Sequence, residues 1–218
     1  MAMSNRCEKC DKVKEKVGSL IILVLVLVVS MNPAWAESDR SQEYKVKAAF
    51  LYNFIKFVEW PKEKIADSNS ITIGIVGENP FGKAFEPLKD KQIKDKNVVI
   101  KQFKGMEESK PSSERIEALK RCHVLFVCRS EAKHLGEIIK SIKGHSVLTV
   151  GDVEGFLESG GIINFLMEDE KVQFEIHNEA AKQAKLDIRS KLLRLAKRTI
   201  DDLSLLIDEE RVMAKLYP

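Results

Sequence analysis

The chain has 218 residues, of which 44% are hydrophobic and 32% are charged. This length gives room for one ordinary domain with a sizeable core, and the composition excludes collagen-like, low-complexity and disordered classes. With 36 Lys and Arg against 33 Asp and Glu, the formal net charge is only +3. No electrostatic indication of nucleic-acid binding is present, and we expect no nucleic-acid partner.

The first 36 residues have the pattern of a secretory signal peptide. A basic stretch comes first, an apolar run over residues 20–29 follows, and Ala34-Trp35-Ala36 places small residues at the expected cleavage site. The apolar run is shorter than the roughly 18 residues that a membrane span needs, although an uncleaved anchor remains an alternative. Glu37, not Cys, follows the cut, which disfavours a lipid anchor. We therefore expect residues 1–36 to be removed and the mature chain to be periplasmic.

The cysteines fall into two groups. Cys7 and Cys10 lie in the expected signal peptide without a nearby second pair, so we expect no metal site there. Cys122 and Cys128 remain in a compartment where disulfides form. If the residues between them form a strand, their Cα atoms lie roughly 20 Å apart, and a disulfide needs about 7 Å or less. Buried free thiols are the simpler interpretation, and an intermolecular bridge or a redox-sensitive thiol is the alternative.

Residues 43–59 carry apolar side chains at helical spacing, and Pro61 ends the run. The apolar positions are Val46, Ala48, Phe50, Leu51, Phe54, Ile55, Phe57 and Val58. They cover most of the circumference of a helix, so we expect this helix to be packed on more than one side.

Strand-like and helix-like segments then alternate. The predicted strands are residues 71–77, 97–103, 123–128 and 146–150, and the predicted helices are residues 79–88, 112–121 and 131–143. The strands are nearly continuous in apolar residues, which is typical of parallel strands covered on both faces. The alternation predicts an α/β fold with a mostly parallel sheet, flanked by helices on both faces and joined by right-handed crossovers.

The pattern changes after residue 161. Two strand-like runs, residues 162–167 and 171–176, are separated by three acidic residues, which predicts an antiparallel hairpin at the edge of the sheet. Asn178 is the expected N-cap of the next helix. Helical character from residue 188 to about residue 216 predicts one long C-terminal helix or two abutting helices.

These elements predict a single domain. We place the α/β domain at residues 37–198 and a C-terminal helical extension at residues 199–218. Ile200, Leu203 and Ile207 would line one face of that extension, which packs onto its own domain or, less simply, contacts a partner.

Catalytic motifs are missing from the sequence. It has no G-x-S-x-G, no H-E-x-x-H and no phosphate-binding loop. Hydrolase or transferase chemistry therefore has the least support, and we expect no enzyme activity, no cofactor and no metal. Gly74 and Gly77 flank a predicted strand end, where an open α/β sheet binds ligands, but a simple turn is the better interpretation. His123 and His177 lie next to strands and are expected to be structural.

Residues 151–161 form the segment densest in glycine and acidic residues, and they follow a predicted strand, where α/β proteins often place function. In the simpler interpretation Asp152 caps a short helix, and Gly160 with Gly161 lets the backbone turn. The alternative is a ligand or partner contact at this edge, formed by Asp152, Phe156, Gly160, Gly161 and Asn164.

Several motifs occur in a recognisable order. Residues 44–61 read YKVKAAFLYNFIKFVEWP, and they are followed by CHVLF at 122–126, LTVGD at 148–152, GGIIN at 160–164, FEI at 174–176 and SKLLRLA at 190–196. In order and spacing these motifs resemble the YfiR-like family of bacterial periplasmic proteins, over roughly residues 43–196.

The resemblance implies a non-enzymatic regulator with an α/β fold that is able to form dimers. The founding member of that family represses an inner-membrane diguanylate cyclase through its periplasmic sensory domain and is relieved by an outer-membrane lipoprotein, and release raises cyclic di-GMP and favours biofilm. We therefore expect this chain to bind the extracytoplasmic domain of such a cyclase or a related sensor. The alternative is a periplasmic sensor with a small-molecule pocket beside Gly77 and Asp152.

The chain departs from the family pattern at two places. The founding member is disulfide-bonded, and the resemblance implies a Cys near the first strand as the partner of Cys122, where this chain has Gly74. Arg189-Ser190 stands where the family has two serines. We therefore do not extend the family's redox switch to this chain.

Overall fold

The computed structural model describes residues 34–66, 69–88, 91–106 and 112–200. The chain divides into two units, residues 1–42 and residues 43–218. The description below concerns the second unit, except that helix α2 (Ala34–Phe57) begins in the first. The expected signal peptide lies outside the described residues up to residue 33, and so do residues 201–218 of the expected extension.

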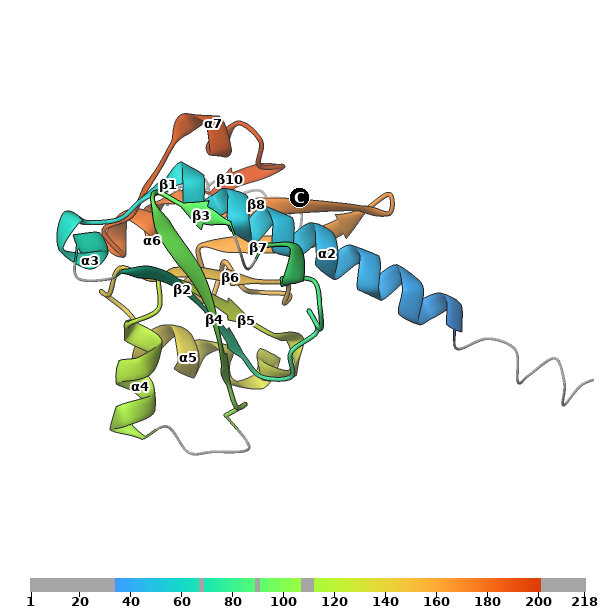
Figure 1. Cartoon of the computed structure of the whole chain (residues 1–218), viewed down its shortest axis with the longest axis horizontal. Coiled ribbons are helices and arrows are strands. Elements are labelled where there is room, and N and C mark those ends of the chain that lie inside the picture. Colours follow the sequence, from blue (N-terminus) through green and yellow to red (C-terminus); the bar gives the residue numbers. More distant parts are fainter. Residues whose placement is uncertain (1–33, 67–68, 89–90, 107–111, 201–218) are drawn as a thin grey trace, which may run out of the picture. The chain divides into compact units, whose positions relative to one another are not determined.

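An eight-stranded sheet forms the centre of the fold, in the order β10-β8-β7-β6-β5-β2-β4-β3 (Figure 1). Its strands are β2 (Ser70–Val76), β3 (Gln92–Ile93), β4 (Lys96–Phe103), β5 (Val124–Val127), β6 (Leu148–Gly151), β7 (Ile163–Glu168), β8 (Lys171–His177) and β10 (Arg198–Ile200). From β4 across to β7 every neighbouring pair is parallel. The predicted mostly parallel α/β sheet is confirmed.

Alternate side chains of the central strands enter two separate cores. On β5, Val124 and Phe126 pack in the core that contains α2, while Leu125 and Val127 pack in the other core. That second core is closed by side chains of α4 (Ser113–Lys120) and α5 (Leu135–Ser141). Figure 1 shows α2 and α4 on opposite sides of β2. Strands that are apolar at every position therefore bury both faces, as parallel sheets do.

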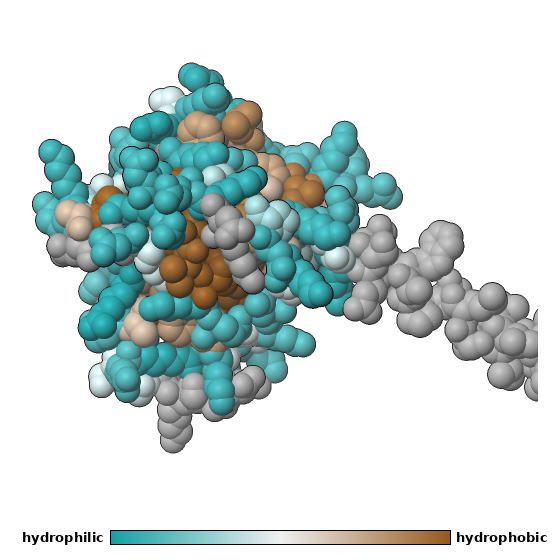
Figure 2. Space-filling view, viewed as in Figure 1, coloured by the Kyte–Doolittle hydropathy of each residue, from teal (hydrophilic) through white to brown (hydrophobic). Residues whose placement is uncertain are grey.

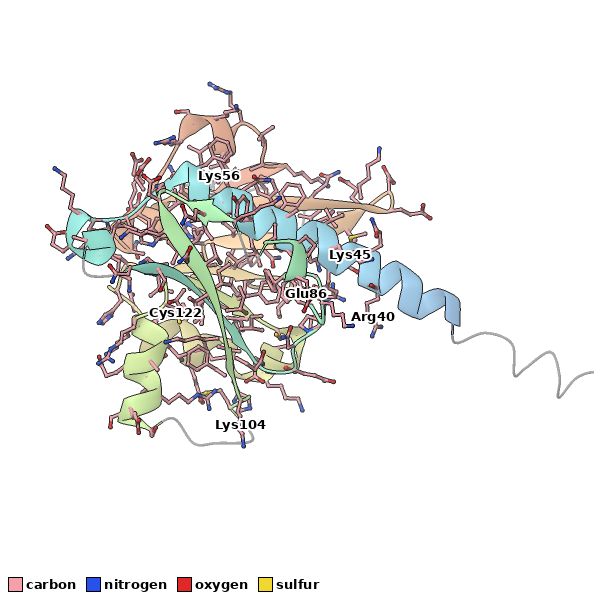
Figure 3. All side chains as sticks on the ribbon, viewed as in Figure 1. Arg40, Lys45, Lys56, Glu86, Lys104 and Cys122 are labelled. Atoms are coloured by element: carbon pink, nitrogen blue, oxygen red, sulfur yellow. The ribbon has the colours of Figure 1, made fainter. Side chains whose placement is uncertain are left out.

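Helix α2 packs through one broad stripe. Its buried residues are Tyr44, Lys47, Ala48, Leu51, Phe54 and Ile55. Its exposed residues in the second unit are Lys45, Ala49, Asn53 and Lys56, of which Figure 3 labels the two lysines. The predicted apolar circumference is therefore only partly buried, because Val46, Phe50 and Phe57 lie at the margins of the stripe.

Directly after α2 the chain enters a second sheet, which has two strands. Val58–Glu59 form β1, which pairs antiparallel with β9 (Asp187–Ile188). The helix predicted over residues 43–59 therefore ends two residues too late, and it begins at Ala34 instead of residue 43. Beyond β1, the short helix α3 (Lys62–Ala66) leads to the first strand of the large sheet.

The predicted C-terminal helix is wrong over its described part. Helix α7 spans only Ser190–Leu193, and residues 198–200 form β10, which pairs parallel with β8. Leu195, which continues the helical pattern, is 63% exposed, whereas Ile200 is buried at the sheet. Pairing with an available strand edge has overridden local helix propensity. Because β10 lies outside β8, the predicted β7–β8 hairpin is present but stands one strand in from the edge.

Three local predictions need adjustment. The helix predicted at residues 79–88 is a turn followed by the 3-10 helix η1 (Glu86–Leu88). The helix predicted at residues 131–143 is split into the 3-10 helix η2 (Arg129–His134) and α5. Helix α6 (Asn178–Gln183) is capped by His177, whose ring accepts a hydrogen bond from the amide of Ala180, so the predicted Asn178 cap is one residue late.

Strand β4 is covered less completely than the central strands. Val98 and Ile100 are half-buried, and Val99 is 38% exposed. Figure 2 shows an apolar area near the middle of the viewed face, in the region where Figure 1 places β4.

Replacing Phe54 tests the packing of α2. Phe54 is fully buried, and its ring contacts the rings of Phe50, Phe165 and Phe174. We expect Phe54→Ala to lower the free energy of unfolding by about 3–5 kcal/mol, through lost burial and a residual cavity. Urea unfolding measures this change, and the exposed neighbour Asn53→Ala should stay within about 0.5 kcal/mol of the parent. Equal stability of the two variants would contradict the observed packing.

Candidate functional site

Asp152 follows β6 at the carboxyl ends of the parallel strands, and its side chain is fully buried. Its Oδ2 accepts hydrogen bonds from the Tyr44 hydroxyl at 2.7 Å and from Lys47 Nζ at 2.6 Å. Lys47 is itself only 1% exposed. A buried charge is costly unless it is paired and hydrogen-bonded, so this pair ties α2 firmly to the strand end.

Two further charges complete a network around this pair. Arg129 Nε donates to the Asp152 carbonyl oxygen at 3.1 Å and lies 3.3 Å from Oδ2. Glu43 Oε1 lies 2.5 Å from Lys47 Nζ and 3.6 Å from an Arg129 guanidinium nitrogen. Burial, with the nearby Asp152 carboxylate, raises the pKa of the Tyr44 phenol, so Tyr44 stays a donor. The network therefore joins α2, η2 and the segment after β6.

The segment after β6 folds over its own aromatic ring. Phe156 is fully buried, and a Cβ at Gly151 or Gly161 would lie 2.5 or 2.2 Å from that ring. Only glycine fits these two positions. Gly160 is exposed and has φ +90°, which favours glycine for conformational reasons. The predicted turn role of the glycine pair therefore agrees with the geometry.

Asn164 lies on β7, directly opposite Gly151 in the register. It therefore shares the face of the sheet on which Phe156 packs, while Asp152 is held by side chains of α2 on the other face. Asn164 Oδ1 and Asp152 Oδ1 are both buried without a hydrogen-bond partner in the described structure. The five candidate residues are thus adjacent in the fold, but they do not converge on one pocket.

Lys47 and Arg129 are the residues that the sequence reasoning missed. Lys47 lies on the buried stripe of α2, between Tyr44 and Leu51, where an isolated lysine requires an anionic partner. Asp152 is the matching carboxylate, and the proposed helix cap at Asp152 is replaced by this ion pair. The sequence feature that could have revealed this pair is a lysine at a core position of an otherwise apolar helix face.

The edge beside Gly77, where the sensor hypothesis places a pocket, is filled by side chains of the protein. A Cβ at Gly77 would lie 2.3 Å from Ser130 Oγ and 2.8 Å from Glu131 Oε1. The amide of Glu78 donates to Ser130 Oγ, and the amide of Met106 donates to Glu131 Oε2. A buried carboxylate at this position opposes anion binding, and Gly77 with φ +95° is a turn residue.

Cys122 and Cys128 are buried and free in the part of the chain that the structure describes. They flank β5 and belong to different cores. Burial raises the pKa of Cys122 to about 11 and the pKa of Cys128 further still, so both are weakly reactive thiols. Figure 3 labels Cys122. A Cβ at Gly74 would lie 2.8 Å from Cys122 Sγ, so Gly74 occupies the place from which a disulfide partner would reach Cys122.

His123 is structural in the observed geometry. It is 1% exposed, and its Nδ1 accepts a hydrogen bond from the amide of Thr72 at 3.1 Å. Burial, with a smaller contribution from the charge of Lys64, lowers its pKa to about 4. The imidazole therefore stays neutral at physiological pH and holds β5 to β2.

Breaking the buried ion pair should be strongly destabilising. In Lys47→Met the Asp152 carboxylate loses its closest cation, and we expect the free energy of unfolding to fall by about 3 kcal/mol. Adding Asp152→Asn should restore part of this loss because the uncompensated charge is removed. Guanidinium unfolding measures both variants, with exposed Lys45→Met as the control. A Lys47→Met protein as stable as the control would rule out the pair as an anchor.

Stability should fall as pH is lowered through the His123 titration. A histidine with a pKa of about 4 when folded and about 6.5 when unfolded binds more protons when unfolded, so its stabilisation is complete above pH 6.5 and is lost toward pH 4. We expect this residue alone to cost about 2 kcal/mol between pH 7.5 and pH 5. His123→Asn keeps an acceptor for the Thr72 amide. Between pH 7.5 and pH 5 the free energy of unfolding of this variant should fall by about 2 kcal/mol less than that of the parent. Parallel profiles of parent and variant would refute this assignment.

Among the described residues, no helix combines the length and apolarity needed to cross a membrane. Comparison with curated proteins gave no match. The family described as YfiR/HmsC-like matches residues 44–197, which include every candidate residue and every member of the charge network except Glu43. Because this match spans more than half of the sequence, the chain belongs to the YfiR/HmsC-like family, which is known for periplasmic regulation of cyclic di-GMP signalling.

Proposed function

We propose that this chain is a non-enzymatic periplasmic regulator that binds the extracytoplasmic domain of an inner-membrane diguanylate cyclase and represses it. The observation that carries the proposal is the family match over residues 44–197. The expected signal peptide at residues 1–36 supports export to the compartment in which such a domain is reached.

Repression acts by occupancy. A binding protein shifts a two-state cyclase only as far as its affinities for the active and inactive states differ. Moving a cyclase from 1% to 99% inactive requires about 5.5 kcal/mol of differential affinity. A regulator with a firmly held contact surface loses little ordering entropy on binding and so binds more tightly, while the difference in affinity comes from contacts made in the inactive state alone.

We place the contact surface on the exposed part of residues 152–161. Asp152 and Phe156 are buried, so their role is to hold the segment, through the ion pair on one side and the packed ring on the other. Glu154, Glu158 and Gly160 are exposed. The two acidic side chains make a basic patch the complementary partner chemistry.

Release of the cyclase is proposed to follow from competition by an outer-membrane lipoprotein for the regulator. A homodimer would present two copies of the contact surface and raise avidity for a dimeric cyclase. The competing lipoprotein and the homodimer are both carried over from the family. Binding to the cyclase domain can be tested without either of them.

Charge reversal on the exposed segment tests the proposal. Deleting the gene should raise cellular cyclic di-GMP, and the parent chain should restore the lower level. We expect Glu154→Lys with Glu158→Lys to fail in this complementation and to weaken binding to the purified extracytoplasmic domain by at least about tenfold. Cyclic di-GMP is measured by mass spectrometry and binding by calorimetry.

The matched control reverses two other exposed glutamates outside the segment. Glu63→Lys on α3 with Glu137→Lys on α5 makes the same change in net charge and should complement fully. Unchanged cyclic di-GMP after gene deletion would contradict the regulatory role. Full complementation by the double variant, with the deletion effect intact, would leave the role standing and refute the surface.

A further inference from the structure

An open cavity of about 370 Å³ lies on the α5 side of the sheet, away from the buried ion pair. Its walls come from α5, the loop into β6, the turn before β7, and α6. Residues from those four parts are Ile139, Val147, Gly160 and Ala180, respectively. A volume in this range accommodates a small organic molecule.

The floor of the cavity is apolar. It is formed by Ile139, Ile142, Val147, Ile162 and Ala180. The first four of these side chains are buried in the cores of the protein and are therefore fixed in position. A rigid apolar floor of this kind binds the hydrocarbon part of a ligand without reorganising.

The charged side chains of the lining are two lysines. Lys140 and Lys143 are exposed, at the end of α5 and directly after it. None of the sixteen residues that line the cavity, all of them described, is an Asp or a Glu. Lysines beside an apolar cavity that has no acidic residue in its lining favour an anionic ligand.

Directional donors are also present in the lining. His177 Nδ1 accepts the amide hydrogen of Ala180, so in the neutral ring Nε2 carries the proton and is a donor. The Thr149 hydroxyl accepts from the amide of Ile162 at 2.9 Å, and its own hydrogen remains for a further acceptor.

Two glycines leave space in the walls. A Cβ at Gly136 or Gly144 would meet no atom within 4 Å. Gly136 lies within α5, where φ is not positive, so a side chain there enters open space without backbone strain.

We propose that this cavity is a binding site for a small amphipathic organic anion, a molecule with one anionic group and a compact apolar body. The apolar body lies on the isoleucine and valine floor, and the anionic group lies toward Lys140, Lys143 and the His177 donor. This site adjoins the proposed partner surface at Ser159 and Gly160, but the variants that test it lie outside that surface and its test needs no partner.

Two isosteric probes test the charge requirement. 2-Naphthoate has an anionic group on a compact apolar body, and 2-naphthamide has the same shape without the charge. Titration calorimetry on the full chain purified from the periplasm should give saturable 2-naphthoate binding with a dissociation constant below about 1 mM, about 5- to 10-fold tighter than the amide.

Two variants test the location. Gly136→Leu should fill the cavity and weaken both probes more than about tenfold, while the better helix propensity of Leu keeps the protein folded. Lys140→Gln with Lys143→Gln should weaken 2-naphthoate by about 5- to 10-fold and leave 2-naphthamide unchanged. The matched control, Lys133→Gln with Lys182→Gln, removes two exposed lysines of neighbouring helices that do not line the cavity.

Each outcome of these titrations either supports the proposed site or overturns it. Binding that follows this pattern supports the site. No saturable 2-naphthoate binding at about 1 mM, equal affinity for the two probes, or equal effects of the lining and control lysine pairs would each overturn it. If Gly136→Leu is unfolded by circular dichroism, the lysine pair decides the location alone. Failure of this site leaves the proposed repressor function untouched, because the cyclase-binding experiment uses other residues.

Discussion

The ion pair between Lys47 and Asp152 is the constraint around which this fold is arranged. Aromatic packing around Phe54 holds α2 against the sheet, but apolar contact is non-directional and tolerates small shifts along the helix axis. A buried lysine and carboxylate at 2.6 Å tolerate no such shift, since either charge left unpaired would be strongly destabilising. The pair therefore fixes the register of α2 on the strand ends, and Arg129 extends the same constraint to the helix after β5.

The same interaction explains the shape of the segment that follows β6. Asp152 is held from the α2 side, and four residues later Phe156 is held between Gly151 and Gly161 on the opposite side of the sheet. A segment of mixed glycine and acidic composition would ordinarily be mobile, because few of its side chains bury apolar area. Here two buried anchors of different chemistry restrain it, and its exposed residues are presented on a nearly fixed backbone.

The sequence alone predicts the parts of this fold that depend on local apolar pattern. The strands at residues 71–77 and 123–128 and the β7–β8 hairpin were predictable because their side chains read as continuous or paired apolar runs. Strand β10 was not predictable from the sequence, because its three residues form a strand only where β8 offers a free edge for pairing. The Lys47–Asp152 pair was also hidden, because 105 residues separate partners that only the folded sheet brings together.

The cavity and the proposed partner surface share one stretch of backbone. Ser159 and Gly160 line the cavity, and they end the segment whose other exposed residues form the surface. Ile162, the next wall residue, is tied to Thr149 by its amide. A ligand in the cavity and a partner on the surface would both contact this stretch, and any change that the ligand makes in partner affinity is matched by an equal change that the partner makes in ligand affinity. A coupling of 1–3 kcal/mol, typical of linked sites, corresponds to a change of about 5- to 150-fold in either affinity.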